Sequence, residues 1–142
     1  MPQASRRQEL PAPELFGVPL PGHEADATPA EAGLAGVCVS MWNEALPGTR
    51  LAERVAALKP VEKRCMVAWM FHTCVRTILQ SDANMREQGA ALLWKRRDRE
   101  AFERSAVAFT EEACKDVRLT SSQFRLLEAL RATIRRTYGE PE

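Results

Sequence analysis

The sequence predicts an all-α fold: a five- or six-helix bundle with a central apolar helix at about residues 61–79, preceded by a Pro-rich extended or disordered N-terminal arm. Three observations support this prediction. Apolar residues recur at steps of three or four through most of the chain after residue 28. No segment alternates apolar and polar residues over the length of a strand. Six of the nine prolines lie between Pro2 and Pro29, where helical spacing is absent.

Length and composition are those of one small globular domain. A chain of 142 residues, 45% hydrophobic and 27% charged, is long enough to bury a core without disulfides. We therefore expect an arm over residues 1–27 and a single helical domain over residues 28–142. The net charge of +1 gives no global field that would attract nucleic acid or a membrane. No apolar run is long enough for a membrane span or a secretion signal, so we expect a cytoplasmic, reducing compartment.

One segment of the arm is too apolar for a typical solvated linker. Residues 10–21 have the sequence LPAPELFGVPLP, in which Leu15, Phe16, Val18 and Leu20 are spaced among prolines. Such a segment docks on the domain's own surface, stays disordered, or binds a partner groove as Pro-rich extended peptides do. The sequence alone leaves these alternatives open.

Start and stop signals divide the first half of the domain into three helices. Residues 28–31 have the pattern of a capping box, and the Pro-Gly pair at 47–48 ends the helix that follows. Thr49 can cap a short second helix, which Pro60 ends. The third helix follows over residues 61–79 and is apolar nearly all round, which is typical of the central helix of a bundle.

The spacing of side chains on this third helix predicts which of them are buried. One stripe is expected to face the core: Val67, Phe71, Cys74 and Ile78. Trp69, on the other side, is expected to be largely buried and His72 to lie near the edge. Arg76 and His72 mark the place where the helix meets solvent or a groove.

Two further helices are expected in the second half. Apolar residues keep steps of three or four from residue 90 to residue 117, which predicts one long amphipathic helix. Residues 120–123, TSSQ, form another capping box. It begins a final helix whose inward row is Phe124, Leu127, Leu130, Ile134 and Tyr138.

The four cysteines do not predict a metal or redox centre. No pair has the close spacing of a zinc ribbon or a CxxC motif. Cys65 and Cys74 are nine residues apart, which places them on opposite faces of a helix or a strand. Cys65 and His72 share a face but lie about 10 Å apart along the axis, too far to chelate one metal. We expect buried thiols; a site that joins two elements through Cys38 or Cys114 stays open.

No catalytic motif is visible, so we expect a non-enzymatic protein without cofactor or metal. The leading hypothesis is a protein–protein interaction or regulatory module. Residues of the types that anchor interfaces occur in the arm and at the three tryptophans: Leu15, Phe16, Trp42, Trp69 and Trp94. Another protein is the expected partner, and a homo-oligomer stays open.

The alternative is a nucleic-acid-binding accessory factor of the phage- or plasmid-type, acting in replication or transcription. Residues 95–100, KRRDRE, place four cations beside Trp94, although acidic neighbours at four-residue spacing also suit a solvated helix face. The basic positions of this alternative are Lys95, Arg96, Arg97, Arg99, Arg131, Arg135 and Arg136.

Two short segments resemble parts of nucleic-acid-binding families. Residues 117–130, VRLTSSQFRLLEAL, resemble the first helix of winged-helix regulators. The resemblance implies DNA binding through a recognition helix and a wing, for which we expect no room in the twelve residues that follow. A well-capped terminal helix accounts for the same residues. Residues 42–47, WNEALP, are similar to a segment of some phage replication initiators, without the basic motif expected downstream.

Overall fold

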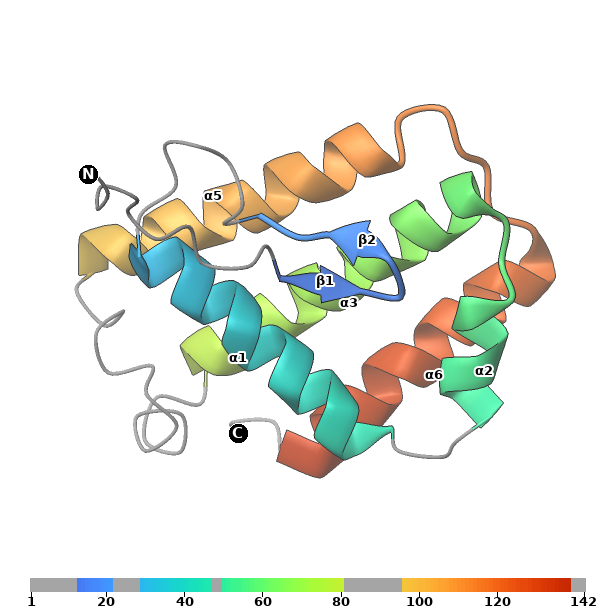
Figure 1. Ribbon diagram of the computed structural model, residues 1–142, viewed down its shortest axis with the longest axis horizontal. Helices are drawn as coiled ribbons and strands as arrows, with labels where there is room; N and C mark the ends of the chain where they lie inside the picture. Colours follow the sequence, from blue (N-terminus) through green and yellow to red (C-terminus); the bar gives the residue numbers. More distant parts are fainter. Residues whose placement is uncertain (1–12, 22–28, 47–49, 81–95, 139–142) are drawn as a thin grey trace, which may run out of the picture.

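A computed structural model shows a helical protein with one small β-hairpin (Figure 1). It describes residues 13–21, 29–46, 50–80 and 96–138. The helices of these ranges are α1 (Pro29–Ala45), α2 (Arg50–Ala56), α3 (Pro60–Gln80), α5 (Arg96–Ala113) and α6 (Ser121–Tyr138), and the strands are β1 (Glu14–Leu15) and β2 (Val18–Pro19). The prediction of a mainly helical fold is confirmed, and the hairpin is an addition to it. Within the described ranges, no helix is both long and apolar enough to cross a bilayer.

Helix α3 is the centre of the fold. It contacts α1, α2, α5, α6 and β2, and Figure 1 shows it running through the middle of the molecule. The expected inward stripe is buried at every position: Val67, Phe71, Cys74 and Ile78. Between residues 65 and 78, all side chains are buried except those of Trp69, His72 and Arg76. The prediction of a central apolar helix is therefore confirmed.

Local signals in the sequence start two of the helices where the structure has them. Pro60 is the first residue of α3, and the Lys59 N–H donates to Glu62 Oε1 at 3.2 Å. At the start of α6, the Thr120 N–H donates to Gln123 Oε1 at 2.9 Å and the Gln123 N–H donates to Thr120 Oγ1 at 3.2 Å. This reciprocal pair is the capping box that the sequence predicts.

Helix α5 lies antiparallel to α3. Near its start, Glu103 pairs with Arg76 at 2.7 Å, and further along the Thr110 hydroxyl donates to the main chain, within 3.2 Å of the Ala68 carbonyl. The partners on α3 thus come earlier in the chain as α5 proceeds. The helix ends at Ala113, four residues before the predicted end, because the chain turns there to bring α6 onto α3.

One predicted core residue of α6 is wrong. Phe124, expected to face inward, is 53% exposed, and Leu126 is buried instead at 3%. Phe124 lies about 120° from the fully buried Leu130 around the helix. The inward face of α6 is therefore centred further toward Leu126, since this helix packs on α2 as well as on α1 and α3.

Within the predicted arm, residues 13–21 form a hairpin that packs on the helices. Leu15 and Val18 form one cross-strand pair, and they and Leu20 are 6%, 7% and 0% exposed within the same hydrophobic core as α3. Of the alternatives left open by the sequence, docking on the domain's own surface is the one found for this segment. The remainder of the predicted arm, residues 1–12 and 22–27, lies outside the described residues.

The hairpin turn places an aromatic residue in an unfavourable backbone conformation. Phe16 and Gly17 both have positive φ, 56° and 81°. Glycine adopts this conformation freely, whereas a bulky side chain costs about 1–2 kcal/mol. The Phe16 ring is half-buried and packs against the core, which offsets part of this cost.

If the hairpin is part of the core, Leu20→Ala will lower the free energy of unfolding by about 2–4 kcal/mol, because it removes a buried side chain. Glu14→Ala, an exposed change in the same hairpin, should alter it by less than about 0.5 kcal/mol. Chemical denaturation of both variants and the wild type measures the difference. Equal effects of the two substitutions would mean that residues 13–21 do not pack on the helices.

Candidate functional site

Between residues 65 and 78, the three side chains of α3 that escape burial lie along one stripe. Trp69, His72 and Arg76 have the spacing i, i+3 and i+7, which places them on the same face of the helix. Glu103 of α5 borders this stripe on one side and Arg131 of α6 contacts it from another. We call these five residues the aromatic–basic cluster.

The Trp69 ring is the centre of the cluster. The Arg131 guanidinium lies over the Trp69 ring, 5.5 Å from its centroid, in a cation–π arrangement. The His72 ring meets the same indole edge-on, with centroids 5.9 Å apart and planes at 68°. Trp69 is thus held between a cation from α6 and an imidazole from its own helix.

An ion pair closes one end of the cluster. Arg76 Nη1 lies 2.7 Å from Glu103 Oε2, and the two side chains are 50% and 39% exposed. Exposed pairs of this kind contribute little to stability, typically about 0–1 kcal/mol. The pair therefore acts mainly to orient Arg76, and the Glu103 carboxylate is already paired with a cation.

Two polar atoms of the cluster have no hydrogen-bond partner among the described residues. They are His72 Nε2 and Arg131 Nε, and both atoms are buried. An unpaired buried polar atom costs about 1–3 kcal/mol, and the guanidinium Nε can only donate. The cluster therefore has hydrogen-bonding capacity that the described part of the fold does not use.

The same surroundings keep His72 neutral. Burial lowers the pKa of His72, the positive charges of Arg76 and Arg131 lower it further, and Glu103 raises it. Protonation would add a third positive charge beside the two arginines, which explains the direction. At neutral pH the imidazole is therefore uncharged and can both donate and accept a hydrogen bond.

Two of the five predicted partner-binding residues are buried in the core. Leu15 and Trp42 are core residues, 6% and 2% exposed, so the structure places neither where a partner could reach it. Phe16 is half-buried in the hairpin turn, and Trp94 lies outside the described residues. Trp69 alone among the five is part of the cluster.

The predicted basic positions are spread over separate helices. Lys95 lies outside the described residues, and the side chains of Arg96 and Arg97 are not described. Arg99 is half-buried on α5, whereas Arg135 and Arg136 are exposed in the last turn of α6. Among the described members of this set, only Arg131 reaches the cluster.

The thiols pair between helices. Cys114 Sγ lies 3.8 Å from the Cys65 carbonyl oxygen, and Cys74 Sγ lies 4.0 Å from that of Cys38. All four are free, and the described residues contain no group of three or more side chains able to hold a metal ion. The nine-residue spacing places Cys65 and Cys74 on different faces of α3. The sequence gives no indication that Cys114 lies near Cys65 or that Cys38 lies near Cys74.

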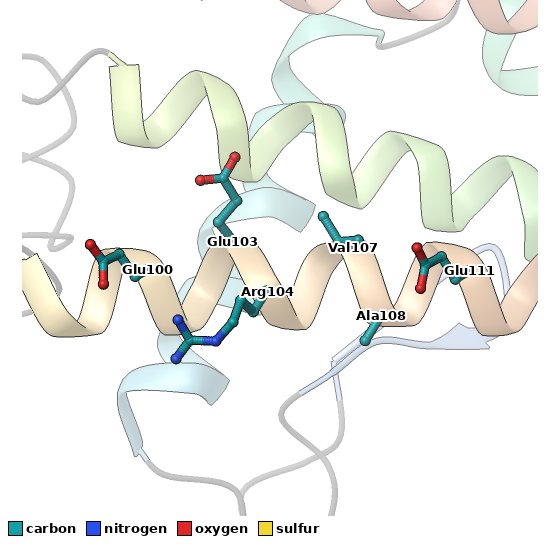
Figure 2. Close-up of a pocket in the computed structure, with 6 residues that line it drawn as sticks. All are labelled: Glu100, Glu103, Arg104, Val107, Ala108 and Glu111. Atoms are coloured by element: carbon teal, nitrogen blue, oxygen red, sulfur yellow. The ribbon is translucent and has the colours of Figure 1, made fainter.

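A shallow hollow along α5 is the other surface feature near the cluster. Its lining comes from one helix: Glu100, Glu103, Arg104, Val107, Ala108 and Glu111 (Figure 2). Three carboxylates and one guanidinium surround Val107, which is 38% exposed. Glu103 extends from this helix toward α3, where it meets Arg76, so the hollow adjoins the aromatic–basic cluster.

No family model matches the chain, and neither a curated protein nor a solved structure is found to be similar to it. The chemistry of the cluster is therefore the basis for inferring function.

An NMR titration is expected to give a pKa for His72 below the usual 6.5. Arg131→Gln should raise this pKa relative to the wild type, because it removes one of two neighbouring positive charges. Arg125→Gln, an exposed change on another face of α6, should leave it unchanged. A wild-type value of 6.5 or above would contradict the described burial of the ring.

The same shift predicts how stability depends on pH. Because the pKa of His72 is lowered in the folded state, the unfolded chain binds the proton more tightly. The contribution of His72 to the free energy of unfolding is therefore complete above about pH 6.5. It is lost as the pH falls from about 6.5 through the pKa of His72 in the folded state. Chemical denaturation of the wild type and His72→Gln gives the difference between their free energies of unfolding. This difference should change with pH over this range and stay constant above it.

Proposed function

We propose that this protein is a non-enzymatic protein–protein interaction or regulatory module, and that the aromatic–basic cluster is its contact surface. The observation that supports this most directly is the Arg131 guanidinium over the half-buried Trp69 ring. Tryptophan and arginine are the residue types that most often dominate binding energy at interfaces. A stacked guanidinium is also held in place before binding, which reduces the entropy lost on association.

The charges of the cluster favour an acidic partner. Arg76 is already paired with Glu103, whereas no described carboxylate lies within ion-pair distance of Arg131. A partner carboxylate would accept a hydrogen bond from Arg131 and bring a charge-assisted bond into a partly dry environment. An apolar side chain beside that carboxylate would cover the exposed part of Trp69.

An exposed aromatic residue extends the proposed surface along α6. Phe124 is 53% exposed and precedes Arg131 by seven residues, so the two lie on the same face about two turns apart. Burial of this ring by a partner would contribute about 25 cal/mol per Å² of apolar surface before the costs of association. The proposed contact surface therefore runs from Phe124 to Arg76.

A charge reversal with a matched control tests the proposal. Affinity capture from the organism that makes the protein would use the wild type, Arg131→Glu and Arg125→Glu as baits. Both substitutions change one α6 arginine equally, but only the first lies in the cluster. We expect a partner bound by the wild type and by Arg125→Glu, with at least tenfold weaker binding of the purified partner to Arg131→Glu.

Equal recovery by all three baits would overturn the proposed surface. Circular dichroism of each variant separates loss of binding from loss of fold. Solution mass measurements over a range of concentrations would identify a second copy of this chain as the partner. Any truncation of the arm should stop at residue 12, because residues 13–21 belong to the core.

The nucleic-acid alternative makes a different prediction for the same variants. Phosphate contacts require binding that weakens steeply with salt, so mixed-sequence DNA and RNA would be tested at two salt concentrations. We expect no binding at low salt. Salt-dependent binding that is reduced by Arg131→Glu or by Arg135→Glu would favour the alternative.

A further inference from the structure

The two thiol pairs differ in their access to solvent. Cys38 and Cys74 are both buried, 1% and 0% exposed, between α1 and α3. In the second pair, Cys65 on α3 is 1% exposed, but Cys114 is only half-buried. A reagent in solution can therefore reach one member of the second pair and neither member of the first.

The two members of the second pair also lie close together. Cys114 directly follows α5, in the turn that leads toward α6, and its Sγ lies 3.8 Å from the Cys65 carbonyl oxygen. The neighbouring Cys65 and Cys114 thiols shift each other's pKa in opposite directions, and Trp69 also acts on the Cys114 thiol. A disulfide would require the Cys114 sulfur to move from this carbonyl oxygen onto the Cys65 sulfur, and Cys114 lies in a turn and not within a helix.

The electrostatics assign different roles to the two thiols. The hydrogen bond from Cys65 lowers the pKa of Cys114, burial opposes this, and the contact with Trp69 lowers it further. Its hydrogen bond with Cys114 and burial raise the pKa of Cys65. Cys114 is thus the half-exposed thiol and the more easily ionised of the two, and Cys65 is its buried neighbour.

We propose that Cys65 and Cys114 form an oxidisable dithiol, in which Cys114 reacts with hydrogen peroxide and Cys65 then closes an intramolecular disulfide. The Cys114 thiolate attacks one peroxide oxygen, the O–O bond breaks, and hydroxide leaves and takes up a proton as water. The Cys65 sulfur then attacks the sulfenic sulfur of Cys114, the S–O bond breaks, and the departing hydroxide takes the Cys65 proton. Two thiols are oxidised to one disulfide, and one peroxide is reduced to two waters.

The disulfide would join the first part of α3 to the end of α5, across a sequence separation of 49 residues. Because Trp69 contacts the Cys114 sulfur, oxidation would also change the surroundings of the aromatic–basic cluster. That consequence rests on the proposed function, whereas the dithiol chemistry does not. Peptide mapping tests the chemistry without any partner.

The test is mild peroxide treatment of the folded, full-length protein, followed by alkylation of the remaining thiols and mass spectrometry. We expect the loss of two hydrogens per chain and alkylation of two of the four cysteines. Trypsin should then release residues 65–76 linked to residues 105–115. Since the first peptide holds both Cys65 and Cys74, fragmentation of the linked pair, or Cys74→Ser, shows which thiol is joined.

Variants separate the exposed pair from the buried one. Cys65→Ser and Cys114→Ser should abolish the linkage, whereas Cys38→Ser and Cys74→Ser should keep it. In Cys65→Ser the Cys114 sulfenic acid should persist and be trapped by dimedone. Circular dichroism checks that each variant folds, and mapping of the wild type decides the question even if one does not.

Several outcomes would overturn the proposal. They are four thiols unchanged by peroxide, a disulfide between two chains, a linkage through Cys38 or Cys74, and overoxidation of Cys114 with Cys65 still reduced. Reversal of the linkage by dithiothreitol is expected for a true disulfide.

Discussion

The burial of α3 on nearly every side is the constraint on which the rest of the structure depends. A helix that is apolar around most of its circumference cannot face water there, so other elements must cover it in nearly every direction. Helices α1, α2, α5 and α6 each supply one part of that cover, and Leu20 of the hairpin adds to the same core. The short strands β1 and β2 owe their order to this need, because an isolated two-stranded hairpin is marginally stable in water.

The place of the candidate site follows from the same constraint. Polar groups are tolerated on a central helix only where they find partners or reach water. On α3 this occurs along the stripe Trp69, His72 and Arg76, where α5 supplies a carboxylate and α6 a guanidinium. Two buried nitrogens in this stripe and its cover, His72 Nε2 and Arg131 Nε, have no hydrogen-bond partner among the described residues. A surface that is aromatic, cationic and short of hydrogen-bond acceptors is suited to binding a protein with carboxylates of its own.

The cysteines illustrate how one packing tendency leads to two chemical situations. Thiols behave as small hydrophobic groups, and the core gathers all four against α3. At the Cys38–Cys74 pair the core is closed, and burial keeps the pKa of Cys74 high. Just after the end of α5, Cys114 is only half-buried.

The sequence by itself determined the helices, because the signals that start and bury a helix are local: the Thr120–Gln123 capping box and the three-to-four spacing act within a few residues. It also placed Trp69, His72 and Arg76 on one face of α3. It did not predict the hairpin, since Phe16 in a left-handed turn has no propensity signal and only the core contacts of Leu20 justify it. Nor did it predict the partners of these side chains. Cys114 meets Cys65, and Arg131 meets Trp69, only because α5 and α6 pack against α3, and contacts between distant segments depend on how whole helices fill the space around a common core.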